Sequence, residues 1–391
     1  MRFPEFTGEW EKKSLGLIAE ITKGNGISKE QLSAQGTPCI LYGELYTKYK
    51  SEIINEIHSK TALNSSSLVK SQANDVIIPC SGETAIDIST ARCVPYNNIL
   101  LGGDLNIIRL KSQDGGFFAY QLNGVRKHDI ARIAQGVSVV HLYGENLKKI
   151  KVFYPSIEEQ RKITSLLSLI DERIATQNKI IEKYESLIQA VIYQKKTDGI
   201  RMGDWQKTEL SKVLQERNEK NINGYDVCSV SVSQGVVNQI EYLGRSFAAK
   251  ETSHYNVVKY GDIVYTKSPT GNFPYGIVKR SCIKDGVAVS PLYGVYMPAN
   301  DHIGVILHFY FMQPNNASNY LHPLIQKGAK NTINITNRRF LENSIPLPKT
   351  ENEALCIANA LKTIQKKIDT EKGLLQSYEK EKEYLLCRMF I

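Results

Sequence analysis

The feature that most constrains this chain is an internal duplication with a period of about half its length. The segment at 8–12 (GEWEK) returns at 203–207 (GDWQK), and these segments contain the only two tryptophans of the protein. The strand-like segment at 74–77 (NDVI) has a related copy at 261–264 (GDIV). The offset is 195 residues for the first pair and 187 for the second. Because the offset varies within each half, we expect a duplicated frame that carries two different inserts.

The end of each half carries a second and clearer repeat. Seven apolar positions step by 4, 3, 4, 7, 3 and 7 residues, and they return at a constant offset of 194. This spacing is typical of a coiled-coil seam. The seam positions are Ile163, Leu167, Ile170, Ile174, Ile181, Tyr184 and Val191 in the first half, and Ile357, Leu361, Ile364, Ile368, Leu375, Tyr378 and Leu385 in the second. Each proline-free run of about 35 residues predicts a helix roughly 50 Å long.

Neither seam is stable in contact with water, so two arrangements are open. Each helix packs on its own globular domain, or the two helices pack on each other; the matched heptads favour the second arrangement. Because each helix follows its own domain, such a pair would be antiparallel, with an approximate twofold axis within one chain. One match is weak, since Ile188 has Lys382 as its counterpart. At the first helix entry, Ser156 with Glu159 fits a capping box.

The residues between these repeats predict the fold class. Short β-rich runs are separated by Gly, Asn, Ser and Pro, which is typical of a small twisted sheet or open barrel mixed with helices. We therefore predict an α+β protein in which two mixed α/β domains are joined by two long antiparallel coiled-coil helices, with a pseudo-twofold internal repeat. The predicted boundaries are 1–155 for the first domain, 156–197 for the first helix, 198–348 for the second domain and 349–391 for the second helix.

Composition excludes several classes of protein. With 42% hydrophobic and 23% charged residues, the chain has too much apolar material for a disordered or collagen-like protein. No apolar run approaches the ~18–20 residues of a membrane-spanning helix, and the N-terminus lacks the apolar core of a signal peptide. We therefore expect no membrane partner and a cytoplasmic location. The seven cysteines include no Cys-x2-Cys pair, so we expect reduced thiols and no metal site.

Motifs for catalysis are missing from the sequence. Gly-Lys never occurs, and neither Gly-x-Gly-x-x-Gly nor the Asn/Asp-Pro-Pro-Tyr/Phe signature of base-methylating enzymes is present. An ATP-binding loop and a dinucleotide site are therefore unsupported, and we expect no catalytic residues and no cofactor in this chain. The net charge of +9 permits nucleic acid or acidic lipid as a partner, without proving either.

Polar clusters in predicted loops occur at equivalent places in both copies. Their mixture suits DNA, because Lys and Arg neutralise phosphates, Ser and Thr fix the register, and Asn, Gln and Arg read base edges. The alternative for any single residue is an ordinary solvated loop. The candidate DNA-binding residues are Lys23, Asn25, Ser28, Tyr42, Tyr46, Lys48, Ser81, Thr84, Gln135, Ser138 and His141 in the first copy, and Asn218, Lys220, Ser231, Ser233, Lys267, Ser268, Asn272, Lys330, Asn331, Thr332, Asn334 and Arg338 in the second.

The junction between the first domain and its helix resembles that of a known family. Pro155 is followed by the run 157–163 (IEEQRKI) and by 166–171 (LLSLID). This proline, Glu-Gln-x-x-Ile and Leu-x-x-x-Asp series is similar to that of the DNA specificity (S) subunits of type I restriction–modification enzymes, and the likeness extends over both copies. The second junction departs from the pattern, because 353–357 reads EALCI and Gln365 stands in place of the aspartate.

The resemblance implies a division of labour. Each domain would be a target recognition domain for one half of a bipartite site on double-stranded DNA, and the helices would set the spacing and dock two methylation (M) subunits. The M subunits would bind S-adenosylmethionine, and restriction (R) subunits joined through them would use ATP and Mg. This chain would be the non-catalytic subunit of an adenine-specific DNA methyltransferase and type I endodeoxyribonuclease. The alternatives are a stand-alone DNA-binding regulator and a coiled-coil protein scaffold that binds no DNA.

Overall fold

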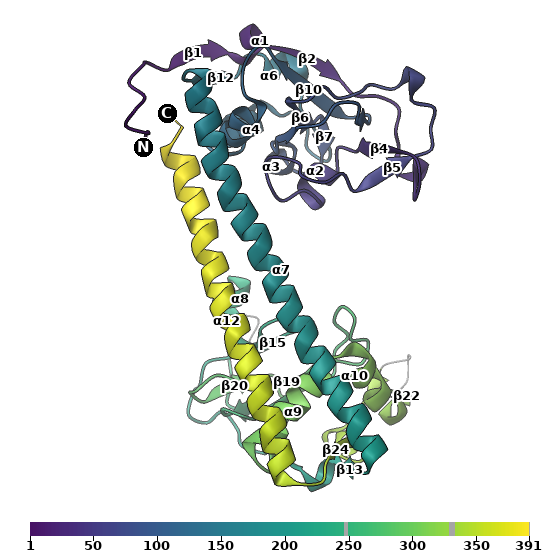
Figure 1. Ribbon diagram of the computed structural model, residues 1–391. Helices are drawn as coiled ribbons and strands as arrows, with labels where there is room; N and C mark the ends of the chain where they lie inside the picture. Colours follow the sequence, from purple (N-terminus) through teal and green to yellow (C-terminus); the bar gives the residue numbers. More distant parts are fainter. Residues whose placement is uncertain (246–248, 328–332, 391) are drawn as a thin grey trace. The chain divides into compact units, whose positions relative to one another are not determined.

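The computed structural model describes residues 1–245, 249–327 and 333–390, and it divides into two compact units. Unit 1 comprises 1–178 and 373–391, and unit 2 comprises 179–372. Each unit holds one globular domain, and each of two long helices contributes one part to unit 1 and the other part to unit 2 (Figure 1).

The first domain, in unit 1, alternates short strands with short helices. Its strands are β1 (Glu11–Ser14), β2 (Ala19–Lys23), β3 (Leu32–Ser33), β4 (Thr37–Ile40), β5 (Ser59–Thr61), β6 (Asp75–Pro79), β7 (Ser81–Gly82), β8 (Arg92–Val94), β9 (Leu100–Leu101), β10 (Leu105–Leu110), β11 (Val140–His141) and β12 (Lys151–Tyr154). Its helices are α1 (Leu15–Ile18), α2 (Glu44–Thr47), α3 (Ala85–Ile88), α4 (Gly115–Asn123), α5 (Lys127–Ile133) and α6 (Gly144–Leu147).

The centre of the first domain is an antiparallel sheet in the order β2-β10-β6-β8. All of β6 and the first four residues of β10 are buried, as expected for central strands that are covered on both faces. The segment between β2 and β10 also builds a second sheet, in the order β3-β5-β4-β9, in which β4 and β9 are parallel. This second sheet covers a small core of its own, around Ile27, Cys39, Leu41 and Leu100.

The second domain, in unit 2, is built in the same manner. Its strands are β13 (Trp205–Glu209), β14 (Leu214–Glu216), β15 (Cys228–Ser231), β16 (Gly235–Asn238), β17 (Asn256–Val258), β18 (Ile263–Tyr265), β19 (Val278–Arg280), β20 (Val287–Val289), β21 (Gly294–Pro298), β22 (Gln326–Lys327), β23 (Ile333–Asn334) and β24 (Ser344–Pro348). Its helices are α8 (Gln239–Leu243), α9 (Asp301–Phe311), α10 (Pro314–Leu321) and α11 (Asn337–Phe340). The central sheet is antiparallel, in the order β14-β21-β18-β19.

The two central sheets correspond in strand order and in register. Ile108 of β10 lies opposite Val76 of β6 in the first sheet, and Tyr296 of β21 lies opposite Ile263 of β18 in the second. Val76 and Ile263 are counterparts at the 187-residue offset found in the sequence. The mixed α/β class and the internal repeat predicted from the sequence are therefore confirmed.

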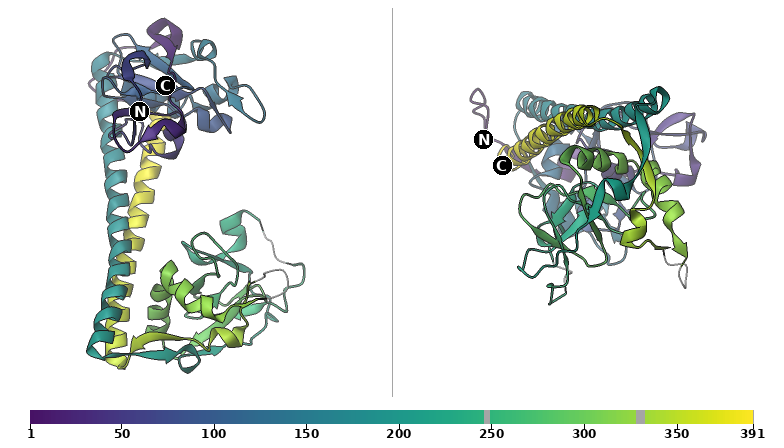
Figure 2. Two further views of the ribbon diagram at one scale, coloured as in Figure 1. Left: turned by 90° about the vertical axis from the view of Figure 1, so that its right-hand side faces the viewer. Right: turned by 90° about the horizontal axis from the view of Figure 1, so that it is seen from below.

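Each domain is closed by a pair formed from its first and last strands. β1 pairs with β12 and β13 pairs with β24, both antiparallel, and the last strand of each pair leads directly into a long helix. Figure 2 shows β13 and β24 beside the ends of the helices in unit 2. The repeated tryptophan segments lie here, because Trp10 precedes β1 and Trp205 begins β13.

The two long helices are α7 (Ile157–Met202) and α12 (Glu351–Arg388). With 46 and 38 residues, they are roughly 69 and 57 Å long, longer than expected. α7 continues beyond the predicted end at 197 and passes through Gly199. An ideal Cβ at that position would lie 1.9 Å from the Trp205 ring, so the glycine allows the ring to pack against the last turn. The helix stops before Gly203, whose φ of +79° is left-handed and typical of a helix end.

The entries of the two helices are held by side chains. Glu159, the predicted partner of Ser156 in a capping box, instead forms a bidentate ion pair with Arg2 in which both N–O distances are 2.7 Å. At α12, the N–H of Glu353 donates to the Thr350 hydroxyl at 3.3 Å. Trp205 Nε1 donates to the Glu353 carboxylate at 2.9 Å, which joins β13 to the start of α12.

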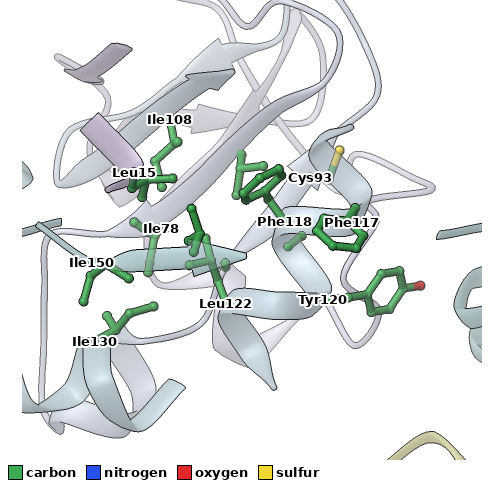
Figure 3. Close-up of a cluster of buried hydrophobic side chains, with 14 of the residues drawn as sticks. Leu15, Ile78, Cys93, Ile108, Phe117, Phe118, Tyr120, Leu122, Ile130 and Ile150 are labelled. Carbon is green, nitrogen blue, oxygen red and sulfur yellow. The ribbon is translucent and has the colours of Figure 1, made fainter. Parts of the chain in front are cut away.

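In unit 1 the helix seam is part of the domain core. Figure 3 shows part of this buried cluster, with Phe117, Phe118 and Tyr120 of α4. The cluster also contains Ile163, Leu167 and Ile170 of α7, Leu385 of α12, and Met389 and Phe390, which directly follow α12. The seam of α7 therefore packs both on its own domain and on the other helix, so the two arrangements that the sequence left open coexist in this unit.

The helices run antiparallel, as predicted. Lys382 of α12 lies 2.6 Å from Asp171 of α7 in unit 1, and Lys372 of α12 lies 2.9 Å from Glu185 of α7 in unit 2. Residue numbers increase along α7 where they decrease along α12, so the two helices run in opposite directions. All fourteen predicted seam residues are buried or half-buried.

The weak seam match at Lys382 has a structural reason. Its ammonium lies 2.6 Å from a carboxylate oxygen of Glu52 and 2.6 Å from one of Asp171, and the three side chains are largely buried. The Tyr120 hydroxyl also donates to Asp171, at 2.7 Å. Burial lowers the pKa of Lys382, but the two carboxylates together raise it above its ordinary value. Its counterpart Ile188 is a buried apolar residue in unit 2.

Candidate nucleic-acid interface

In the first domain, several predicted residues lie at one edge of the central sheet. Lys23, which is exposed, ends β2 and lies opposite Asn106 of β10, and Asn106 in turn lies opposite Ile78 of β6. Ser81 follows β6 and lies opposite His141 in the β7-β11 pair. The antiparallel order thus brings Lys23, Ser81 and His141, which are distant in the sequence, to the same edge.

The loop between α5 and β11 is exposed and tightly closed. Two backbone hydrogen bonds between Gln135 and His141, of 2.9 and 2.7 Å, form its base. Gly136 has a φ of +122°, and an ideal Cβ there would lie 2.1 Å from the carbonyl oxygen of Val139. Only glycine fits this position. Gln135 and Ser138 are exposed on the loop, as a DNA-reading role requires.

Aromatic side chains border this loop. The His141 ring stacks on Tyr143, with 6.2 Å between ring centres and 28° between planes. The Tyr46 hydroxyl of α2 lies 3.7 Å from the Cβ position of Gly82 on β7. Burial raises the pKa of Tyr46, and the neighbouring Tyr42 raises it further. The phenol therefore stays neutral and keeps its hydrogen-bond donor.

Asn25 and Ser28 form bonds within the domain. The Asn25 amide donates to the carbonyl of Ser67 at 3.2 Å and accepts from the N–H of Val69 at 3.0 Å. The N–H of Ser28 donates to the Gln31 side chain at 2.9 Å. The Asn25 amide is therefore engaged in holding two loops together, which leaves less of it for reading bases.

Lys48 and Thr84 also have partners within the domain. The Lys48 ammonium lies 2.6 Å from Glu44 and 3.1 Å from the Ser59 hydroxyl. Thr84 caps α3, because its hydroxyl accepts from the N–H of Asp87 at 3.1 Å and donates to the Asp87 carboxylate at 2.6 Å. These bonds explain why polar residues occur here without reference to any ligand.

The second domain presents the corresponding edge. Asn218 follows β14 and is the counterpart of Lys23 at the 195-residue offset, and Ser268 follows β18 as Ser81 follows β6. Asn334 lies opposite Gln326 in the β22-β23 pair. Asn218, Ser268 and Asn334 are all exposed.

The loop after β18 has a constrained backbone. Lys267 has a φ of +59°, in the left-handed region that is uncommon for a residue with a side chain. Burial lowers the pKa of its ammonium. Thr270 and Phe273 exchange backbone hydrogen bonds of 3.0 and 2.9 Å, which form a tight turn that exposes Asn272.

Other candidates of the second domain lie in its insert. The Lys220 ammonium donates to the Asn256 side chain at 2.6 Å. At the β15-β16 hairpin, the Ser231 hydroxyl lies 3.2 Å from that of Ser233 and 3.1 Å from that of Tyr242. Lys220 is thus engaged within the domain, whereas the serines and the tyrosine form a small exposed hydroxyl cluster.

The remaining candidates precede the second helix. Arg338 of α11 is 93% exposed, with Glu342 at 3.8 Å, so its guanidinium is accessible to a phosphate or a base. The predicted residues Lys330, Asn331 and Thr332 lie outside the described residues.

Two exposed residues at this interface were absent from the sequence-based candidates. Val137, at the tip of the α5–β11 loop, is 96% exposed, and Tyr143 is 46% exposed beside His141. The sequence held a signal for the first, since a valine between Gly136 and Ser138 interrupts an otherwise small and polar turn. In the structure Gly136 has a left-handed φ of +122°, and the valine that follows it is exposed.

The part of the chain that the structure describes has no helix long and apolar enough to cross a membrane. Among the same residues, no group of three or more His, Cys, Asp or Glu side chains is placed so that it could hold a metal ion.

The first half of the chain matches a known family model, and the whole chain has similar relatives. The family model for the type I restriction modification DNA specificity domain matches residues 7–186. The specificity subunit of the type I restriction enzyme MjaVIII from Methanocaldococcus jannaschii is 23% identical, with 99% of this chain and 92% of the relative covered. The S subunit of a type I system from M. genitalium has a similar fold, with a TM-score of 0.64 at 13% identity over 100% of this chain and 99% of that chain.

A second solved structure has the same fold. It comes from work on complex assembly and conformational transition of the type I restriction–modification system, and it has a TM-score of 0.51 at 13% identity over 98% of this chain and 97% of that chain. Residues 7–186 therefore match the type I restriction modification DNA specificity domain, and the chain as a whole is similar in sequence to one type I specificity subunit and in fold to the S subunit from M. genitalium.

Proposed function

We propose that this chain is the non-catalytic, sequence-reading subunit of a type I complex, and that each domain reads one half of a bipartite site on double-stranded DNA. The observation that carries the proposal is the pair of equivalent sheet edges, which share one framework and present different side chains. Lys23 and His141 are exposed at the first edge, where Ser81 is buried, and Asn218 and Ser268 are exposed at the second. Two unlike readers on a repeated frame fit an asymmetric site in two halves.

The side chains at these edges have suitable chemistry. Lys23 and Arg338 are exposed cations that can neutralise phosphates, and the net charge of +9 favours DNA in general. Gln135 and Asn334 carry exposed amides that can contact an adenine edge in two places. His141 adds a ring that is already oriented by stacking on its neighbour.

The proposal assigns the helices a spacing role. α7 and α12 would fix the distance between the two half-sites and dock two methylation subunits, which would supply S-adenosylmethionine and the adenine chemistry. Restriction subunits bound through them would use ATP and Mg. The buried seam and the antiparallel ion pairs support a rigid spacer. As part of the same proposal, the complex acts in the cytoplasm.

Methylome sequencing tests the proposal. Cells that express the chain with its methylation partners should carry a bipartite adenine-methylated motif that disappears when this chain alone is deleted. A methylome that is unchanged by the deletion would overturn the proposal. A coiled-coil scaffold would show no salt-dependent DNA binding, and a stand-alone regulator would bind its site tightly without the partners.

A further inference from the structure

The tip of the α5–β11 loop presents an apolar side chain on a rigid support. Val137 is 96% exposed and Val139 is 53% exposed. The two Gln135–His141 hydrogen bonds and the left-handed Gly136 fix the backbone. Valine is also stiff, because branching at Cβ restricts its χ1 angle. The side chain is therefore held in place before any partner arrives, and its contact surface is gained with little further loss of conformational entropy.

Apart from Val139, the residues next to the tip on this loop are polar. Ser138 is exposed next to Val137, and Gln135 and His141 lie at the base of the loop. On double-stranded DNA, the apolar group available to a protein among polar base edges is the C5-methyl of thymine, which lies in the major groove. That groove is wide enough for a two-stranded ribbon, and the loop is carried by the narrow β7-β11 pair.

We propose that Val137 is a specificity-determining residue of the first domain, and that its side chain contacts the C5-methyl group of a thymine in the major groove of the half-site read by that domain. The inference rests on the proposed function, because it names a feature of the DNA that the first domain recognises. Ser138 and Gln135 would then bond to neighbouring polar base edges.

The sequence of the second copy supports a difference between the two readers. The corresponding segment between β22 and β23 has the sequence GAKNT at 328–332, which contains lysine, asparagine and threonine and no valine. We therefore expect methyl-group recognition at the first half-site, independent of what the second domain reads.

The experiment uses the assembled complex of the full chain with its methylation partners. Duplexes carry the motif found by methylome sequencing, and each thymine of the first half-site is replaced in turn by deoxyuridine, which lacks only the methyl group. Wild-type complex should bind one of these duplexes roughly tenfold more weakly than the thymine duplex. Val137→Ser should bind that duplex and the thymine duplex equally, and Val137→Thr, which keeps one methyl, should restore part of the preference.

Leu17→Ser is the matched control. Leu17 is also exposed, at 70%, and it lies in α1 just before β2, at the opposite end of that strand from Lys23. This variant should keep the wild-type preference for thymine over deoxyuridine. The proposal is overturned if deoxyuridine has no effect on the wild type, if Val137→Ser keeps the preference, or if the first half-site contains no thymine on either strand. Failure of the wild type to bind any bipartite duplex would instead overturn the proposed function, and the inference with it.

Discussion

Between β2 and β10 the first domain builds a second four-stranded sheet, whereas between β14 and β21 the second domain builds a hairpin, β15-β16, and a separate strand pair, β17-β20. Around these unlike inserts, both central sheets keep the same strand order, and both domains close with their first and last strands. Divergence is thus concentrated in the inserts, because the central strands are buried and a change in their register would expose the core.

A buried ion pair shows how the frame is kept while residues change. Asp75 and Asp262 are counterparts at the start of the central strands β6 and β18. Asp75 binds Arg109 of β10, at 2.8 Å, and Asp262 binds Arg217, which follows β14, at 2.7 Å. β14 corresponds to β2 and not to β10 in the strand order. The arginine therefore comes from a different strand of the sheet in each domain. The comparison indicates that the buried carboxylate needs a cation, from whichever strand supplies one.

The helix seam differs in the same manner between the two units. Asp171 and Lys382 form a buried pair in unit 1, and their counterparts in unit 2 are the neutral Gln365 and Ile188. Both members of the pair have changed together, which avoids a buried charge without a partner.

The largest expected effect comes from exchanging one reader. Under the proposed function, replacing residues 1–155 with the first domain of a known type I specificity subunit should change the whole first half-site and leave the second half-site as it was. The reason is that the unlike inserts are confined to separate domains. Methylome sequencing measures both half-sites at once, and altered bases in the second half-site would contradict independent readers.

Next in size is the loss of the buried lysine of the seam. Lys382→Ala leaves Glu52 and Asp171 without their cation, and we expect a loss of about 3–5 kcal/mol in the free energy of unfolding. Lys372→Ala is the matched control on the same helix, because its pair with Glu185 is exposed and should contribute about 1 kcal/mol or less. Urea titration followed by circular dichroism measures both losses in the free energy of unfolding. Equal losses would show that burial of the Lys382 pairs adds nothing to their contribution.

A smaller effect is expected at two buried cations in equivalent strands. Arg92 of β8 donates to the carbonyls of Leu45 and Tyr49 at 3.1 and 2.9 Å, whereas burial lowers the pKa of its counterpart Lys279 to about 8. The unfolded chain then binds the extra proton between pH 8 and the ordinary value of 10.5, so stability rises with pH over that window. Lys279→Met should remove this rise and stabilise the protein by about 2 kcal/mol at pH 7.

Unfolding free energies measured at pH 7 and pH 10 check this comparison. Arg92→Met should act in the opposite direction, with a loss of about 2–3 kcal/mol at both pH values, since it leaves buried carbonyls without a donor. A rise with pH that persists in the Lys279→Met variant would assign it to other groups.

The smallest effect distinguishes two glycines within the long helices. Gly373→Ala meets open space and should stabilise the protein by about 0.5–1 kcal/mol, the usual gain within a helix. Gly199→Ala should destabilise it, because the new methyl group would overlap the Trp205 ring. Thermal unfolding measured by calorimetry gives both signs, and stabilisation by both changes would show that the ring is free to move away.

The frame could be predicted from the sequence because periodic and repeated features encode it. The heptads predicted the helices, the order of domain and helix in each half predicted their antiparallel pairing, and the tryptophan segments marked where each domain begins. The inserts could not be predicted, because strands of two to four residues such as β3 and β9 carry too little pattern to show their partners. The extension of α7 through Gly199 and the apolar-to-charged exchange at Lys382 depend on contacts between distant segments.

The candidate interface was predictable only in its type of residue. Composition identified polar loops, but it did not separate side chains that are engaged within the domain from those that are accessible. Asn25 and Lys220 have partners in the fold, whereas Gln135 and Ser138 are exposed. Val137 was not among the predicted residues because its exposure depends on the φ angle of the preceding glycine, which the sequence does not show.

The strand pairs β1-β12 and β13-β24 have a consequence for how such a protein can change over generations. Each pair brings the first and last strands of its domain side by side, so that the residues between them form one separate domain. Genetic recombination that replaces the residues between the paired strands keeps both strands and the register of the helix that follows. Under the proposed function, a new target preference could then arise in a single crossover event that leaves the frame intact.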